Sequence, residues 1–275
     1  MQFEVPWALG PADGRYVLRP HAGEDASHVV VLSTMGAPQR RRLRGRRPRP
    51  VDPEPGVEPV PVTRATIIEA IPLTDEEEAA AWLRRVDGEA HAAAALAVLN
   101  RVIAAHRIAA DDPGARDVTR SVALVVRVGH GAGEEVAEGR HTAAVELPAP
   151  RVERRAAALR AQERLSALLS GRDAVLAAER LTQRARCDLT AGRSREAALT
   201  LRVALEAALA ELVPWRDRGD IGARLTELTE ARTDVAAVAN RALQGGLDPE
   251  EEATVDRVLR RLEAAMRARA AVGFD

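Results

Sequence analysis

The sequence contains no lysine. All 40 of its cationic residues are arginine. Its single cysteine, Cys187, excludes an intrachain disulfide and a metal cluster held by several cysteines, and we expect this thiol to be at least partly buried. Aromatic residues make up only 2% of the chain, so leucine, valine, isoleucine and alanine must build any core. No run of 18 apolar residues occurs, so the sequence predicts no membrane-spanning segment.

The first residues, MQFEVPWALG, lack the basic start and apolar centre of a secretion signal. The formal net charge is −1, so no global field would steer the whole protein to nucleic acid or a membrane. Arginine, alanine, glycine and proline are the residues that a GC-rich bacterial genome favours. We therefore expect a cytoplasmic bacterial protein, and no motif in its sequence calls for a cofactor.

Strand signals are confined to the first 149 residues. Alternating or β-branched segments separated by turn residues are typical of short strands. Between them, Thr74 with Glu77 three residues on has the pattern of a capping box, and a second helix is expected at about 89–110. The predicted strands cover 2–7, 15–19, 28–34, 63–73, 121–128 and 142–147.

After Pro148 and Pro150 the apolar residues recur at helical spacing. We expect a helix capped by Ser194, another that runs from Asp220 to Gly245, and a last one that starts at Asp248. Whether residues 151–190 form one helix or two stays open at Gly171. Short links between amphipathic helices favour an antiparallel bundle, and a solenoid of helical repeats is the alternative.

The predicted fold class is α+β in two parts. Residues 1–149 are expected to form an antiparallel or mixed β-sheet with two inserted helices. Residues 150–275 are expected to form an antiparallel helical bundle. The sequence leaves the strand order undetermined.

An arginine tract is the sharpest local feature of the sequence. Residues 37–61 combine this tract with a proline-rich, acidic stretch, so we expect an exposed loop. Guanidinium groups can bind phosphate oxygens without reading a base sequence, which makes the tract a candidate anion or nucleic-acid site. Its members are Arg40, Arg41, Arg42, Arg44, Arg46, Arg47 and Arg49.

Histidine spacings give only weak signals. His130, Glu134 and His141 carry metal-ligand atoms, but their spacing in a glycine-rich loop matches no strong template, and we predict no metal site. We expect this loop, 129–139, to be a flexible hairpin tip without phosphate-binding chemistry.

Arg101 and His106 form an R-x4-H pair inside the second predicted helix. This pair resembles that of HEPN-type ribonucleases in those two residues only, because Val102 replaces the polar residue usual after the arginine. The resemblance implies a histidine that acts as general acid or base and an arginine that holds the phosphate. The alternative is an exposed arginine and a histidine at the edge of an apolar face.

Three classes of function follow from the sequence. The first is a non-enzymatic interaction or scaffold protein that self-associates or docks a protein partner through its C-terminal helices. The second is an anion- or nucleic-acid-binding protein that uses Arg40–Arg49. The third is an enzyme, for example a HEPN-like ribonuclease, whose site is assembled from residues distant in sequence.

Overall fold

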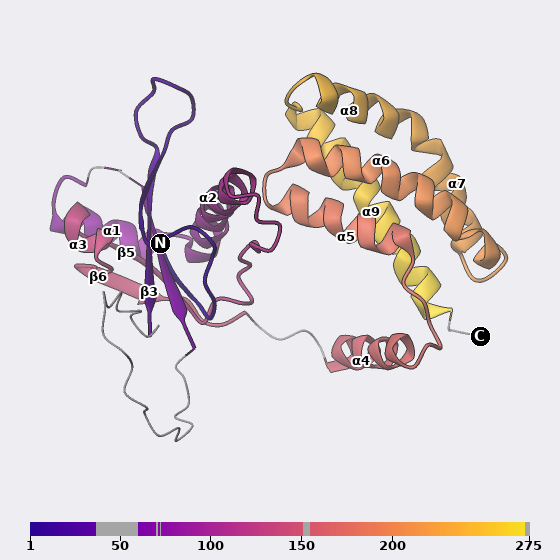
Figure 1. The fold of residues 1–275 in the computed structure, drawn as a ribbon, viewed down its shortest axis with the longest axis horizontal. Coiled ribbons are helices and arrows are strands. Elements are labelled where there is room, and N and C mark those ends of the chain that lie inside the picture. The colour runs from indigo at the N-terminus through magenta and orange to yellow at the C-terminus, as the bar shows by residue number, and fades with distance from the viewer. Residues whose placement is uncertain (37–59, 70, 72, 151–154, 273–275) are drawn as a thin grey trace, which may run out of the picture. The chain divides into compact units, whose positions relative to one another are not determined.

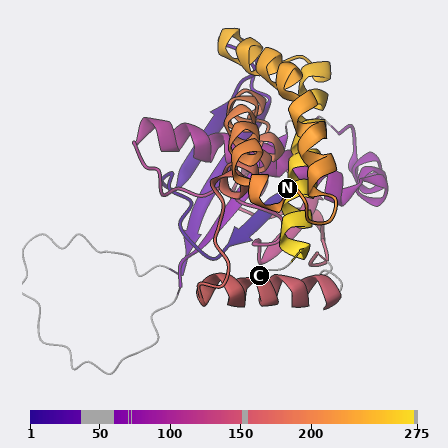
Figure 2. The ribbon, with the colours of Figure 1, turned by 90° about the vertical axis from the view of Figure 1, so that its right-hand side faces the viewer.

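The computed structural model describes residues 1–36, 60–69, 71, 73–150 and 155–272. The chain divides into two compact units, an N-terminal unit of residues 1–151 and a helical unit of residues 152–275. Figures 1 and 2 show the ribbon of both units.

The N-terminal unit is built on one six-stranded sheet with the order β2-β3-β4-β1-β5-β6. Every neighbouring pair is antiparallel, which settles the choice between an antiparallel and a mixed sheet and confirms the α+β class. The strands are β1 (Gln2–Val5), β2 (Gly14–Leu18), β3 (His28–Met35), β4 (Val62–Glu69), β5 (Val125–His130) and β6 (Ala143–Glu146).

Helix α2 (Gly88–Ala109) covers one face of this sheet (Figure 1). Alternate strand residues such as Phe3, Val30 and Val126 are buried on that face, together with Leu99 and Ile103 of the helix. α2 is long and apolar enough to cross a membrane by length and composition alone. Its packing against the sheet accounts for that composition, since a core helix is also apolar.

Two local predictions for this unit need correction. Helix α1 (Glu76–Arg85) has its N-cap at Asp75, whose side chain accepts from the Glu78 amide, while Glu78 accepts from the Thr74 amide. The capping pair therefore lies one residue later than the predicted Thr74–Glu77 pair. The predicted hairpin tip at 129–139 contains the short helix α3 (Gly133–Ala137), because Val136 is buried and anchors it.

The helical unit has a core of alanine and leucine. Residues 151–190 hold two helices, since the chain leaves helical conformation between Ser170 and Leu176. The helices are α4 (Arg155–Leu169), α5 (Ala177–Thr190), α6 (Ser194–Glu211), α7 (Ile221–Glu230), α8 (Arg232–Gln244) and α9 (Pro249–Ala271), with a 3-10 turn η1 (Val213–Trp215).

The prediction of a single helix from Asp220 to Gly245 is wrong. The chain forms α7 and α8, and Ala231 is both the C-cap of the first and the N-cap of the second. The Thr229 hydroxyl donates to the Leu225 carbonyl at 2.7 Å, a contact that bends helices. Two other predictions also differ: α6 has Arg193 rather than Ser194 at its N-cap, and Cys187 is exposed on α5.

Candidate functional site

Polar side chains gather at one end of the sheet because adjacent strands run in opposite directions. β4 and β5 both flank β1 in antiparallel pairing, so their last residues lie at the same sheet end. His28 at the start of β3 pairs with Glu69 at the end of β4, and His130 ends β5. By strand alternation all three lie on the face that α2 covers.

A cavity of about 560 Å³ lies at this end of the sheet. His28, Glu69 and His130 line it from the strands, while Trp82 of α1 and His91 of α2 line it from the helices. A volume between about 300 and 1,000 Å³ is ordinary for a small-molecule site. The rest of its wall is mostly aliphatic and includes Ile67, Ile68, Ile71, Leu73, Val98, Val128 and Val136.

His91 is held in a defined orientation. Its ring packs edge-on against Trp82, with the centroids 5.9 Å apart and the planes at 80°. Its Nδ1 lies 3.1 Å from the Asp87 carbonyl oxygen, which can only accept a hydrogen bond. Nδ1 is therefore the donor in this contact.

His130 contributes a nitrogen with unused hydrogen-bonding capacity. Its Nε2 is shielded from solvent, and within the described residues it has no hydrogen-bond partner. The Met1 amino group also lines the cavity and donates to the Ile67 carbonyl at 2.8 Å. Burial lowers the pKa of this amino group to about 6, and the charge of Glu69 opposes the shift.

The opposite face of the sheet carries an ionic cluster. Glu4 accepts from Arg64 at 3.2 Å and from Arg127 at 3.3 Å, and Arg127 also pairs with Glu146. The Gln2 amide lies in the same cluster, because its oxygen accepts from Arg127. These contacts join β1, β4, β5 and β6 on the face that α2 does not cover.

His141 lies beside this cluster. Its Cδ2 would be 2.9 Å from a Cβ added at Gly129, so the absence of a side chain there makes room for the ring. Burial lowers the pKa of His141, and the positive charges of the Met1 amino group, Arg127, His130 and Arg64 lower it further. Both effects favour the neutral imidazole over its charged form in the folded chain.

We expect this neutral histidine to make the N-terminal unit sensitive to acid. The unfolded chain takes up a proton on His141 below about pH 6.5, while the folded chain resists it, so stability falls as the pH decreases through that range. Urea unfolding of the full chain from pH 7 to pH 5 measures this loss, and His141→Gln should reduce it. His21→Gln, at an exposed position, is the control; equal pH dependence in both variants would contradict the assignment.

The residues predicted as sites have different outcomes. The tract Arg40–Arg49 lies outside the described residues, so its role stays a prediction. Glu134 does not join a site with His130, because it forms a two-bond ion pair with Arg15 at 2.9 and 2.7 Å. No group of three metal-binding side chains occurs among the residues that the structure describes.

Arg101 and His106 line a second cavity together. The helix that carries them, α2, belongs to the α+β unit. Arg101 is exposed and the His106 side chain is 25% exposed. The first cavity was not anticipated, because His28, Glu69, His91 and His130 share no sequence spacing. The fold of antiparallel strands is what brings them together. The only sequence signal was that His28 stands at the start of a predicted strand.

The chain matches no family model, no curated protein and no solved structure.

Proposed function

We propose that the N-terminal unit binds a small molecule with an apolar body and a polar group. The observation that supports this most is the cavity of about 560 Å³, whose aliphatic wall is interrupted by three histidines and one glutamate. Sites for small ligands usually combine an apolar lining with a few polar groups that fix orientation. This proposal leaves open the three classes of function that the sequence suggested. It concerns only the N-terminal unit, residues 1–151.

The polar groups define what the ligand carries. His91 lines the cavity with its orientation set by the contact of Nδ1 with the Asp87 carbonyl. His28, His130 and Glu69 add polar side chains to the same lining. A hydroxyl or amine group on an apolar ring or chain can hydrogen-bond to side chains of these types.

Filling the cavity should abolish binding of an apolar probe. Ala94 lines the cavity and is itself exposed, so Ala94→Trp places an indole in the cavity without replacing a core residue. Titration of the full chain with the neutral fluorophore N-phenyl-1-naphthylamine should give saturable binding. We expect the substitution to weaken this binding at least tenfold, which is a loss of about 1.4 kcal/mol.

Ala93→Trp is the matched control, because Ala93 is an exposed neighbour on α2 that does not line the cavity. It adds the same indole to the same helix, and its binding should equal that of the unmodified protein. Equal weakening in both variants, or no saturable binding to the unmodified chain, would refute the proposal. Circular dichroism of each variant establishes that the fold is kept.

Self-association through the helical unit stays a prediction. Apolar side chains are exposed there, among them Leu165 and Leu169 on α4, Val203 on α6 and Leu243 on α8. They are distributed over three helices, and single exposed apolar residues are ordinary on protein surfaces. The small-molecule proposal rests on the more specific observation.

A further inference from the structure

A second cavity, of about 440 Å³, lies along the other half of α2. Strand β2 and the residues before it form one wall, and the α2 segment from Arg101 to Ala109 forms the other. The first cavity is lined by α2 residues 90–98 instead, so the two cavities share a helix but no lining residue.

The charges of this second cavity have one sign. Arg19, Arg101 and His106 line it, and no carboxylate is among its lining residues. Within the described part of the chain, neither arginine has an ion-pair partner. Arg101 donates one hydrogen bond, to the Arg19 carbonyl at 2.9 Å, so most of its five N–H groups remain available. Guanidinium groups suit carboxylate and phosphate groups.

His106 is fixed in place by its surroundings. A Cβ at Gly10 would lie 2.8 Å from its Cδ2, and Gly10 has a φ of +106°, so both the ring's position and the backbone favour glycine. The nearest carboxylate, Asp112, has its Oδ2 4.0 Å from His106 Nε2, while its Oδ1 accepts from the Gly114 amide. The imidazole thus has a restrained position at the cavity wall.

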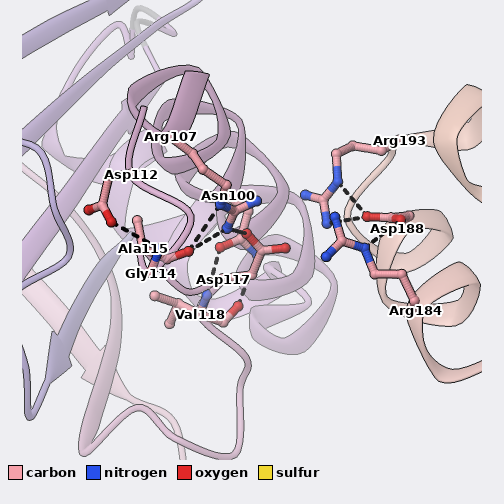
Figure 3. A network of polar contacts seen from close by, with 10 residues as sticks. All are labelled: Asn100, Arg107, Asp112, Gly114, Ala115, Asp117, Val118, Arg184, Asp188 and Arg193. Atoms are coloured by element: carbon pink, nitrogen blue, oxygen red, sulfur yellow. Dashed lines mark hydrogen bonds and ion pairs between the residues drawn. The ribbon is translucent and has the colours of Figure 1, made fainter. Parts of the chain in front are cut away.

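The segment that follows α2 is anchored to this helix (Figure 3). Arg107 donates from Nε and Nη2 to the Ala115 carbonyl at 3.0 and 2.6 Å. Asn100 bonds both backbone groups of Val118. These contacts hold residues 112–118 against α2, and they leave Arg101 and His106 free to face the cavity.

The remaining wall is apolar. Val102 and Leu18 line it and are each only 8% exposed. The cavity therefore presents cationic groups and an aliphatic surface to the same ligand. An inorganic ion would use only the first of these features.

We infer that this cavity binds a small organic anion, with a phosphate or carboxylate group against Arg19, Arg101 and His106 and an apolar ring or chain against Leu18 and Val102. This site is separate from the proposed neutral-ligand cavity. Charge and volume carry the inference independently of that proposal.

Isothermal titration of the full chain with phenyl phosphate tests it. Phenyl phosphate should bind more tightly than phenol, which lacks the anion, and more tightly than inorganic phosphate, which lacks the ring. The double variant Arg19→Gln/Arg101→Gln should weaken phenyl phosphate binding at least tenfold. Both arginines are exposed, so the fold should survive.

The matched control is Arg84→Gln/Arg116→Gln, which removes the same charge from two other exposed positions of the N-terminal unit. Its affinity for phenyl phosphate should stay unchanged. If both double variants lost the same affinity for phenyl phosphate, the binding would depend on the overall positive charge of the unit and not on this cavity. Phenol or inorganic phosphate binding as tightly as phenyl phosphate, or no measurable binding of phenyl phosphate, would overturn the inference.

Discussion

Replacing Asp173 with alanine should lower the free energy of unfolding of the helical unit by about 3–5 kcal/mol, because it leaves a buried guanidinium without its counter-charge. The Asp173 side chain is 1% exposed and that of Arg269 is 5% exposed, and the two are joined at 2.5 Å. Asp173 also pairs with Arg164, which bonds Glu179 as well. The network ties α4, α5 and α9 together.

The buried Arg269 guanidinium depends on the Asp173 carboxylate, because its other contacts leave two of its nitrogens without a hydrogen bond to any described residue. Its Cζ lies 4.9 Å from the Trp215 ring centroid, but its Nε and Nη1 are buried and have no hydrogen-bond partner among the described residues. Burial by itself would raise the pKa of Asp173, but the hydrogen bonds and charges of Arg269 and Arg164 outweigh it and lower the pKa. The carboxylate therefore stabilises the fold above about pH 4, and that stability is lost as the pH falls below it.

Chemical denaturation of the full chain, followed by circular dichroism at 222 nm, measures the loss. Hydrogen exchange of α6 amides assigns the transition to the helical unit. The control is Arg184→Gln, because Arg184 is 64% exposed and its partner Asp188 keeps Arg193 at 2.9 Å (Figure 3). We expect this control to change the free energy of unfolding by less than about 1 kcal/mol.

A second variant separates the lost charge from the lost packing. Asp173→Ala/Arg269→Met removes both charges, so it should recover most of the stability that Asp173→Ala loses. If Asp173→Ala cost no more than Arg184→Gln, or if the double variant were worse than the sum of its parts, the buried ion pair would not be what stabilises this end of the bundle.

Features set by neighbouring residues were predictable from the sequence. The last helix begins where Asp248, Pro249 and Glu251 predict it, with Asp248 accepting from the Glu250 and Glu251 amides and Glu251 accepting from the Asp248 amide. Every contact in that cap spans three residues or fewer, so composition and spacing are sufficient. Fold class is predictable for the same reason, because strand and helix periodicities are local properties.

Features set by tertiary contacts were not predictable. The break at Ala231 interrupts a continuous helical pattern, because α7 packs mainly against α9 whereas α8 packs mainly against α6. The first cavity needs β1 to lie between β4 and β5, an order that no spacing in the sequence encodes. The second cavity was visible only as the Arg101–His106 pair. Arg19, which follows β2 far earlier in the chain, had no signal of its own.

Replacing Asn100 with leucine should destabilise the N-terminal unit by about 3 kcal/mol. Asn100 is 6% exposed, and its Nδ2 donates to the Val118 carbonyl at 2.9 Å while its Oδ1 accepts from the Val118 amide at 2.7 Å. Leucine has a similar size but satisfies neither backbone group. Each polar group left buried without a partner costs about 1–3 kcal/mol.

Asn240→Leu is the matched control, because Asn240 is the other asparagine of the chain and lies exposed on α8. Its effect on the free energy of unfolding should stay within about 0.5 kcal/mol. Hydrogen exchange gives a local measurement as well: Asn100→Leu should raise exchange in residues 112–118, and Asn240→Leu should leave it unchanged. Unchanged protection in Asn100→Leu would mean that Arg107 alone holds the segment. Faster exchange there would mean that a side chain in the middle of α2 holds the segment 112–118 against the helix.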